Sequence, residues 1–182
     1  MRAAPGPEDA YLVARAQDGY LDAFELLVQR YSAAAYRVAL RLSGNHHDAQ
    51  DIAQEALAAA WENLDRLRDG SVFSTWLYRI VTRRALNKIT RGRLPGSGDI
   101  LDAIPDPGRD PSVQAEQAVA ADAVTRALAA LPLAQRTVVV LHHLEGLTYA
   151  EVASVTRSTI PAVRSHLFRA RRTLGAELAE WR

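Results

Sequence analysis

The chain has 182 residues, 48% of them hydrophobic, so it carries enough apolar material to bury a core and lacks the composition of a disordered chain. Its formal net charge is only +1, and it contains no cysteine, which excludes a disulfide framework, a thiolate metal site and a cysteine nucleophile. The first residues lack the apolar stretch of a signal peptide and no run approaches a membrane span, so we expect a cytoplasmic protein that does not contact a membrane.

Two helices are predicted first along the chain. Asp22 and Glu25 have the spacing of a helix start, and Gly44 is placed to end that helix. Between them, apolar residues recur every three or four positions, at Phe24, Leu27, Val28, Tyr31, Ala35, Val38 and Leu42. A second helix is predicted to begin near Asp48, because acidic residues suit a helix N-terminus. Its inward-facing stripe is predicted to be Ile52, Leu57, Trp61 and Leu64.

A third helix is predicted after a loop at residues 66–72, over the segment "FSTWLYRIVTRRALNKITR". The residues predicted to face inward are Phe73, Trp76 or Leu77, Ile80, Ala85 and Ile89. The positions left over form a basic surface made of Arg79, Arg83, Arg84, Lys88 and Arg91.

The composition changes at residues 92–112, "GRLPGSGDILDAIPDPGRDPS", which are rich in proline and glycine and mildly acidic. Such a stretch is typical of a flexible linker, and one of this length would be unusual inside a single compact domain. The sequence therefore predicts an all-α protein of two small helical domains, residues 1–91 and 113–182, joined by a linker at 92–112.

The second half is predicted to be helical again, with helices over 112–130 and 133–144 and a stop at Gly146. Thr148 and Glu151 then have the spacing of a capping box, so a short helix is predicted over 149–155. Thr159 can cap a last helix whose first turn contains Pro161. The buried stripe of that helix is predicted to be Val163, Leu167, Ala170 and Leu174.

Positive charge accumulates on the last helix. Residues 157–174 contain no acidic residue and five arginines, Arg157, Arg164, Arg169, Arg171 and Arg172. A short helix, a tight turn and a second helix with exposed arginines is the layout of a helix-turn-helix, in which the second helix enters the major groove of DNA. The alternative is a solvated basic face on an ordinary helical hairpin.

Two blocks of sequence resemble the group IV, or extracytoplasmic-function (ECF), bacterial sigma factors of the sigma-70 family. The segment "LPLAQRTVVVLHHLEGLTYAEVASVTRSTIPAVRSHLFRARRTL" is similar to sigma region 4, and "DAQDIAQEALAAAW" with "FSTWLYRI" is similar to the most specific parts of sigma region 2. The resemblance covers most of the chain apart from the linker and a few residues at each end. It implies a subunit that binds core RNA polymerase and directs promoter-specific initiation, with no catalytic residue, cofactor or metal of its own.

The resemblance also implies three binding surfaces. The polymerase-binding residues, which would dock on the clamp helices of the largest subunit, are Asp48, Gln50, Asp51, Gln54 and Glu55. Residues that would meet the melted −10 element are Asp69, Ser71, Phe73, Trp76, Arg79, Arg83, Arg84 and Lys88, although for Trp76 the sequence favours a place in the core over a stacking role. Residues that would read the −35 element are Arg157, Thr159, Arg164, Ser165, Arg169 and Arg171. Further implied partners are the flap region of the polymerase, promoter DNA and an anti-sigma factor.

The chain departs from the family pattern at three positions near DNA. Arg83 stands where the family often has asparagine, Arg157 replaces a glycine common at the turn, and Ala162 replaces the usual threonine. Promoter preference therefore does not transfer. The loss of glycine at position 157 predicts an altered turn, or one that avoids the left-handed conformation.

Other functions remain open from the sequence. A stand-alone helix-turn-helix regulator would bind duplex DNA tightly without polymerase, and a helical adaptor would bind only protein. An enzyme or metalloprotein has little support, because the pairs His46–His47 and His142–His143 are neighbours that point about 100° apart rather than along one helix face. No metalloprotease, phosphate-loop or nucleophile-elbow motif occurs.

Overall fold

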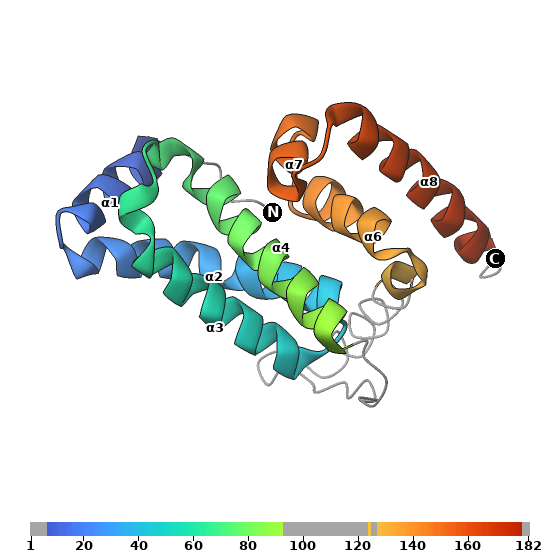
Figure 1. The fold of residues 1–182 in the computed structure, drawn as a ribbon, viewed down its shortest axis with the longest axis horizontal. Helices are drawn as coiled ribbons and strands as arrows, with labels where there is room; N and C mark the ends of the chain where they lie inside the picture. The colour runs from blue at the N-terminus through green and yellow to red at the C-terminus, as the bar shows by residue number, and fades with distance from the viewer. Residues whose placement is uncertain (1–6, 93–123, 125–126, 180–182) are drawn as a thin grey trace, which may run out of the picture.

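In the computed structural model, residues 7–92, 124 and 127–179 are described, and every regular element among them is helical. The N-terminal half, residues 7–92, contains α1 (Pro7–Gln17), α2 (Leu21–Ser43), α3 (His46–Glu62), the short 3₁₀ turns η1 (Leu64–Arg66) and η2 (Gly70–Val72), and α4 (Phe73–Gly92). The C-terminal half, residues 127–179, contains α6 (Leu133–Val139), the π-helical segment η3 (Val140–Leu144), α7 (Tyr149–Thr156) and α8 (Ile160–Ala179). The all-α prediction is confirmed, and the two halves lie side by side (Figure 1).

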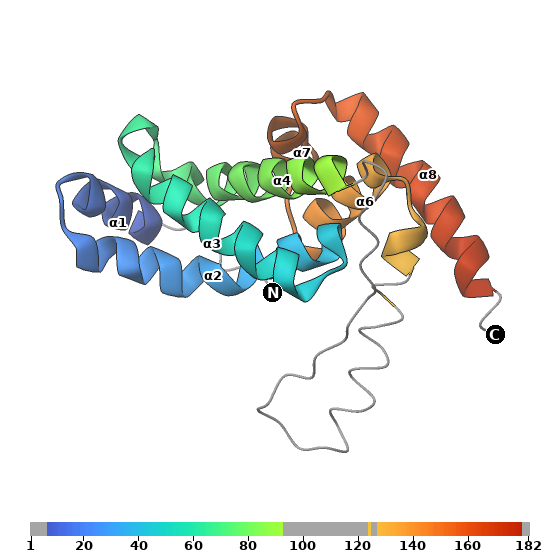
Figure 2. The same cartoon turned by 60° about the horizontal axis from the view of Figure 1, so that its bottom comes forward.

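Helix α2 is the centre of the N-terminal half and packs against α1, α3 and α4 (Figure 2). Its predicted stripe is confirmed, since Leu27, Val38 and Leu42 are completely buried. Gly44 ends the helix as predicted, with a φ of 74° that glycine adopts at little cost. The helix begins at Leu21, so Asp22 lies inside its first turn and the N-cap is Tyr20, whose side chain makes no capping bond.

Helix α1 was not predicted, and a buried ionic contact attaches it to α2. Asp9 on α1 is fully buried and accepts hydrogen bonds from Tyr31 and Arg30 of α2. Burial and the nearby Asp9 carboxylate raise the pKa of Tyr31. A buried carboxylate needs such partners, because an unpaired one would cost several kcal/mol, on the order of 3–5.

Helix α3 packs closely on its neighbours through small residues. Its buried positions are Ala49, Ile52, Ala53, Ala56 and Ala60. The prediction that Trp61 faces inward is wrong, because Trp61 follows Ala60 and is turned about 100° away from the buried stripe. It is 40% exposed and its ring lies 4.9 Å from that of Phe24 at the edge of the core.

Helix α4 buries one face along its whole length. Phe73, Leu77, Val81 and Ala85 are each at most 1% exposed, at the four-residue spacing of a single helix face. Ile80 and Ile89 are half-buried at its edges, and so is Trp76. The predicted third helix is therefore confirmed, with Leu77 rather than Trp76 in the centre of the core.

The helix-turn-helix region agrees closely with the sequence patterns. Thr148 accepts a hydrogen bond from the backbone N–H of Glu151, whose side chain accepts one from the N–H of Thr148, so the capping box is formed. Gly146 ends the preceding helix with a φ of 74°, and that helix finishes in the π-helical segment η3. Thr159 caps α8 by accepting a hydrogen bond from Ala162 N at 3.3 Å.

The turn between α7 and α8 corrects one expectation. Arg157 adopts the left-handed conformation, with φ 53° and ψ 43°, and it is the only residue other than glycine with a positive φ in the described ranges. The predicted avoidance of this conformation is wrong: the backbone keeps the turn that glycine would make. A side chain in this region costs about 1–2 kcal/mol more than glycine would.

Some predictions fall outside the described ranges. The linker at 92–112 is described only at Gly92, which ends α4. The helix expected over 112–130 is described only at residue 124 and over 127–130, where the chain is helical. Within the described residues, no helix has the length and apolar character needed to cross a membrane.

Gly70 is required by the packing of η2 on α1. A Cβ atom at this position would lie 2.8 Å from the Cα of Ala10 and 3.0 Å from the Cβ of Val13. We predict that Gly70→Ala lowers the free energy of unfolding by about 2 kcal/mol, through overpacking against backbone. Gly175→Ala is the matched control, because nothing lies within 4 Å of its Cβ and helix propensity should leave stability equal or raised. Urea unfolding of both variants tests this, and equal stability would contradict the assigned contact.

Candidate nucleic-acid interface

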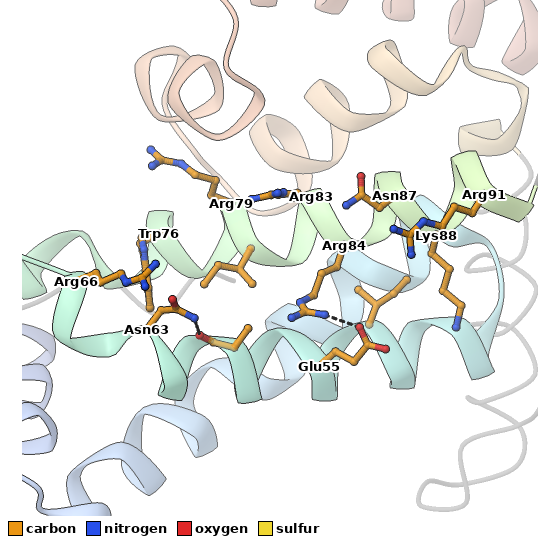
Figure 3. Close-up of a pocket in the computed structure, with 13 residues that line it drawn as sticks. Glu55, Asn63, Arg66, Trp76, Arg79, Arg83, Arg84, Asn87, Lys88 and Arg91 are labelled. Atoms are coloured by element: carbon orange, nitrogen blue, oxygen red, sulfur yellow. Dashed lines mark hydrogen bonds and ion pairs between the residues drawn. The ribbon is translucent and has the colours of Figure 1, made fainter.

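An open groove of about 780 Å³ runs between α3 and α4 (Figure 3). Ile52 and Ala59 contribute to its α3 wall, and Trp76 lies at one end, half-buried and close to Arg66. The groove has six basic side chains against one acidic one, Glu55; the basic set is Arg66, Arg79, Arg83, Arg84, Lys88 and Arg91. A basic groove with an aromatic ring at its edge suits a single nucleic-acid strand, whose phosphates need cations and whose bases stack on rings.

The basic residues of α4 point in two directions. Arg84 and Lys88 reach toward α3, where Arg84 pairs with Glu55 at 2.5 Å and Lys88 Nζ lies 2.8 Å from Asp48 and 2.9 Å from Asp51. Arg79 points instead toward the C-terminal half and donates to Ser154 Oγ at 2.6 Å (Figure 3). Arg83 is exposed on that same side of α4. The two directions give these cations different immediate partners.

The ion pairs on α3 change the titration of their members. The hydrogen bond from Lys88 lowers the pKa of Asp51. Burial alone would lower the pKa of Lys88, but its hydrogen bonds to Asp48 and Asp51 raise it. Two predicted sets, polymerase-binding and −10-binding, therefore meet at a shared cluster of charges. Sequence spacing gave no sign of this contact.

The remaining polymerase-binding candidates lie on the outer surface of α3. Gln50 and Gln54 are exposed one turn apart, so they share one side of the helix. Asn45, before the first turn, accepts a hydrogen bond from Asp48 N at 2.9 Å and fixes where α3 begins. With α3 starting at this point, Gln50 and Gln54 lie at the surface, and Asp48, Asp51 and Glu55 lie toward α4.

The loop before α4 presents two of the −10 candidates and buries a third. Asp69 and Ser71 are exposed, and Asp69 accepts hydrogen bonds from the backbone N–H and the hydroxyl of Ser71. The hydroxyl hydrogen bond, with the backbone one, lowers the pKa of Asp69. Phe73 corrects the expectation, because it is 1% exposed and packs between Tyr31 and Trp76, out of reach of DNA. Its role is to hold the end of the loop on the core.

A second basic surface lies on α8, apart from the groove. Arg164, Ser165, Arg169 and Arg171 are exposed on this helix, and Arg157 is exposed in the turn before it. Arg169 donates to Ser165 Oγ at 2.9 Å, and the guanidinium of Arg164 lies 5.6 Å from the ring of Tyr149 on α7. Val163, Leu167 and Ala170 are buried on the opposite face. The structure thus brings the predicted −35 residues together, with Thr159 as the helix cap.

The groove contains residues that were not singled out as binding residues from the sequence. Arg66 lies beside Trp76, and Asn87 lines the wall between Arg83 and Arg91 (Figure 3). Asn87 could have been found from its spacing, since it is four residues from Arg83 on the same helix. Arg66 could not, because its place beside Trp76 depends on the 3₁₀ turn η1.

One acidic cluster has the composition of a cation site. Ligand atoms of His47, Asp48 and Asp51 lie within 4.8 Å of one another. Both carboxylates already pair with the Lys88 ammonium, which supplies the positive charge that they need. The cluster is therefore explained as part of the contact between α3 and α4.

Two family models match the chain, one in each half. The sigma-70 region 2 model matches residues 27–94, and the sigma-70 region 4 model matches residues 121–174. The chain is 35% identical over 181 residues to the RNA polymerase sigma-H factor of Pseudomonas aeruginosa, covering 94% of each protein. The chain belongs to the ECF sigma factors. It is also 34% identical to the ECF RNA polymerase sigma-E factor of Escherichia coli K12, covering 91% of this chain and 92% of that protein.

Two solved structures share the fold. CnrH, solved in complex with the cytosolic domain of CnrY, is 28% identical with a TM-score of 0.74, covering 95% of this chain and 98% of that one. The sigma factor RpoE of Bartonella quintana, solved with the anti-sigma factor NepR, has a TM-score of 0.70 at 24% identity, covering 86% and 96%. The groove between α3 and α4 of this sigma factor lies in the part matched as region 2, and the basic face of α8 lies mainly in region 4.

The charge cluster predicts a specific titration. Removing the ammonium in Lys88→Met should raise the pKa of Asp51 toward its ordinary value, because the hydrogen bond that stabilises the carboxylate is lost. Asp51 would then remain protonated to a higher pH. Side-chain carboxyl NMR titration measures this, with Asp69 as an internal control whose partner is Ser71. An unchanged Asp51 midpoint would show that the contact does not form in solution.

Proposed function

We propose that this sigma factor binds core RNA polymerase and places it at promoters by reading a −35 element in duplex form and a −10 element in melted form. The single observation that carries the proposal is the presence of two separate basic surfaces on one chain, the groove beside α4 and the exposed face of α8. A stand-alone regulator needs only the second. Residues 1–91 and 113–182 would be the two functional domains, with 92–112 as the tether between them.

The surface on α8 has the chemistry of duplex recognition. In a helix-turn-helix, the second helix lies in the major groove and its N-terminal residues contact base edges. Arg164 and Ser165 are in the first two turns of α8, and Arg169 follows one turn later. Arginine can bind guanine through two hydrogen bonds, whereas Arg157 and Arg171 at the flanks are placed for phosphates.

The groove beside α4 has the chemistry of single-strand capture. Arg79, Arg83 and Arg66 would hold phosphates of the non-template strand, and the half-buried Trp76 would offer its exposed edge to a base. Asp69 and Ser71 are exposed at the loop before the helix, where an extruded base could be held. Strand separation would then be driven by binding energy that offsets unstacking, with no covalent step and no catalytic residue.

The exposed side of α3 is the proposed polymerase contact. Gln50 and Gln54 would meet the clamp helices directly, whereas Asp48, Asp51 and Glu55 hold α3 against α4. CnrH and the Bartonella RpoE were each solved with another protein, CnrY and the anti-sigma factor NepR. We extend this to the present chain: an anti-sigma factor would regulate it in the cytoplasm.

The proposed function is tested by transcription in vitro with purified core polymerase on a library of randomised promoter fragments. We expect transcripts only when the protein is added, all from templates that share two short elements spaced like −35 and −10. Tight duplex binding by the protein alone, with no new transcripts, would favour the stand-alone regulator instead.

Charge reversal on α8 separates the DNA-binding role from protein binding. We predict that Arg164→Glu with Arg169→Glu lowers promoter-directed transcription more than about 30-fold, since each contact contributes about 1–3 kcal/mol. Binding to core polymerase should persist, as measured by co-migration in gel filtration. Arg15→Glu, on α1 beside Tyr20, is a control that leaves both surfaces intact. Transcription that survives the double reversal would indicate a protein-binding adaptor.

A further inference from the structure

The histidine pair His142–His143 lies in the π-helical segment η3 and has no part in the surfaces described so far. The backbone N–H of Glu145 donates to the carbonyl of Val140, five residues earlier, at 3.0 Å, as in a π turn. Such a turn contains one residue more than an α-helical turn, is rare in proteins and often lies at a functional site. The side chains of η3 are therefore candidates for a role that the DNA and polymerase surfaces do not explain.

The ring of His142 is fixed by three contacts. Its Nδ1 atom lies 2.7 Å from the carbonyl oxygen of Leu147, which can only accept, so Nδ1 carries the proton and donates. The ring centre lies 4.6 Å from that of Tyr149 and 4.7 Å from that of His143. The hydrogen bond and the two rings together fix the orientation of the His142 side chain, and His142 in turn holds the Tyr149 ring in place.

Tyr149 connects these rings to α8. It is the first residue of α7, directly after the capping-box residue Thr148, and it is partly buried. The guanidinium of Arg164 lies 5.6 Å from the centre of its ring. A cation within about 6 Å of an aromatic ring is attracted to it. Residues 157–174 contain no acidic residue, so this part of α8 offers Arg164 no carboxylate, and the Tyr149 ring orients its guanidinium.

Arg169, the other arginine proposed to contact bases, is held in a different way. Its guanidinium donates to the Ser165 hydroxyl at 2.9 Å and to the Ser165 carbonyl at 3.4 Å, one turn earlier on the same helix. The orientation of Arg169 is therefore set within α8, whereas that of Arg164 depends on α7 and η3. An arginine binds guanine through two hydrogen bonds, so the direction of its planar guanidinium decides whether both can form. A guanidinium that is held before binding loses less conformational entropy in the complex.

We propose that His142 and Tyr149 are positioning residues for Arg164, and that Arg164 held in this way selects guanine at one position of the −35 element. The DNA target rests on the proposed function, whereas the contacts from His142 to Arg164 are a property of the chain alone. Neither positioning residue has to touch DNA, because each acts through the guanidinium. The π turn thus has a role in promoter choice, since it carries the ring on which Tyr149 packs.

The proposal is tested by transcription with core polymerase on templates that have a fixed −10 element and a randomised −35 element. Arg164→Ala identifies the position that Arg164 reads, as the one whose guanine preference is lost. Tyr149→Leu should lower the guanine preference at that position about two- to fivefold, the strength of an exposed cation–π contact, and leave the other positions unchanged. Tyr149→Phe retains the ring and should behave as the wild type. A loss shared equally by all templates would mean that Tyr149 only supports the fold, and would overturn the proposal.

A double-mutant cycle tests whether Tyr149 acts through Arg164. In an Arg164→Ala background, Tyr149→Leu should cause no further change in base preference, because no guanidinium is left to orient. In an Arg169→Ala background it should retain its full effect, since Arg169 is held by Ser165. Tyr11→Leu, the same exchange at an exposed position of α1, is the matched control and should change nothing. An equal effect of Tyr149→Leu with and without Arg164 would refute the positioning role.

The variant His142→Leu tests the contact that holds Tyr149. It removes both the donor to Leu147 and the ring beside Tyr149, so the guanine preference should fall at the same position, by no more than in Tyr149→Leu. Combined with Tyr149→Leu it should add nothing, because His142 acts only through Tyr149. An effect at other positions of the element, or one that adds to that of Tyr149→Leu, would overturn the role of His142.

The contact itself can be measured by NMR in the free chain, without DNA or polymerase. The ring current of Tyr149 should shift the side-chain proton resonances of Arg164 upfield, and Tyr149→Leu should abolish that shift while Tyr149→Phe keeps it. Wild-type Arg164 resonances without the shift would overturn the proposal. A wild-type library that yields no shared −35 element, with the shift present, would contradict the proposed function and leave the positioning contact standing.

Discussion

The buried face of α4 is the constraint on which the rest of the molecule depends. Phe73, Leu77, Val81 and Ala85 must stay in the core, and this fixes the rotation of the helix about its axis. Once the rotation is fixed, Arg84 and Lys88 lie toward α3, and Arg79 lies toward the C-terminal half. One apolar stripe therefore sets the partners of Arg79, Arg84 and Lys88, and the buried face of α3 on the other side of the groove consists mostly of alanines.

The net charge of the chain is nearly neutral, but its paired and its exposed cations lie in different places. Acidic residues of α3 neutralise Arg84 and Lys88, and Glu145 neutralises two arginines of α2, so these four cations are paired within the protein. The cations left exposed, such as Arg83 and Arg164, gather where nucleic acid is proposed to bind. A small total charge thus coexists with local fields that steer an anionic partner.

Local signals in the sequence predicted local structure well. The capping box of Thr148 and the glycine stops at 44 and 146 were correct, because caps and left-handed residues depend only on nearby atoms. The prediction for Trp61 was wrong because it ranked residues by hydrophobicity alone. The smaller Ala60, one position earlier, occupies the close contact between the helices instead. The pairing of Glu145 with Arg41 joins residues 104 positions apart, and no spacing rule reaches that far. Phe73 shows the remaining limit, since a residue beside a functional loop can serve only the core.

The strained turn at Arg157 sets stability and recognition against each other. Glycine at this position would relax the backbone, yet it would remove a cation from the rim of the proposed DNA surface. A lineage selected for heat resistance would gain from the exchange, whereas one selected for firm hold on its promoters would keep the arginine. We therefore expect related chains to have glycine at this turn where selection for stability has been stronger, and arginine where selection for promoter binding has been stronger.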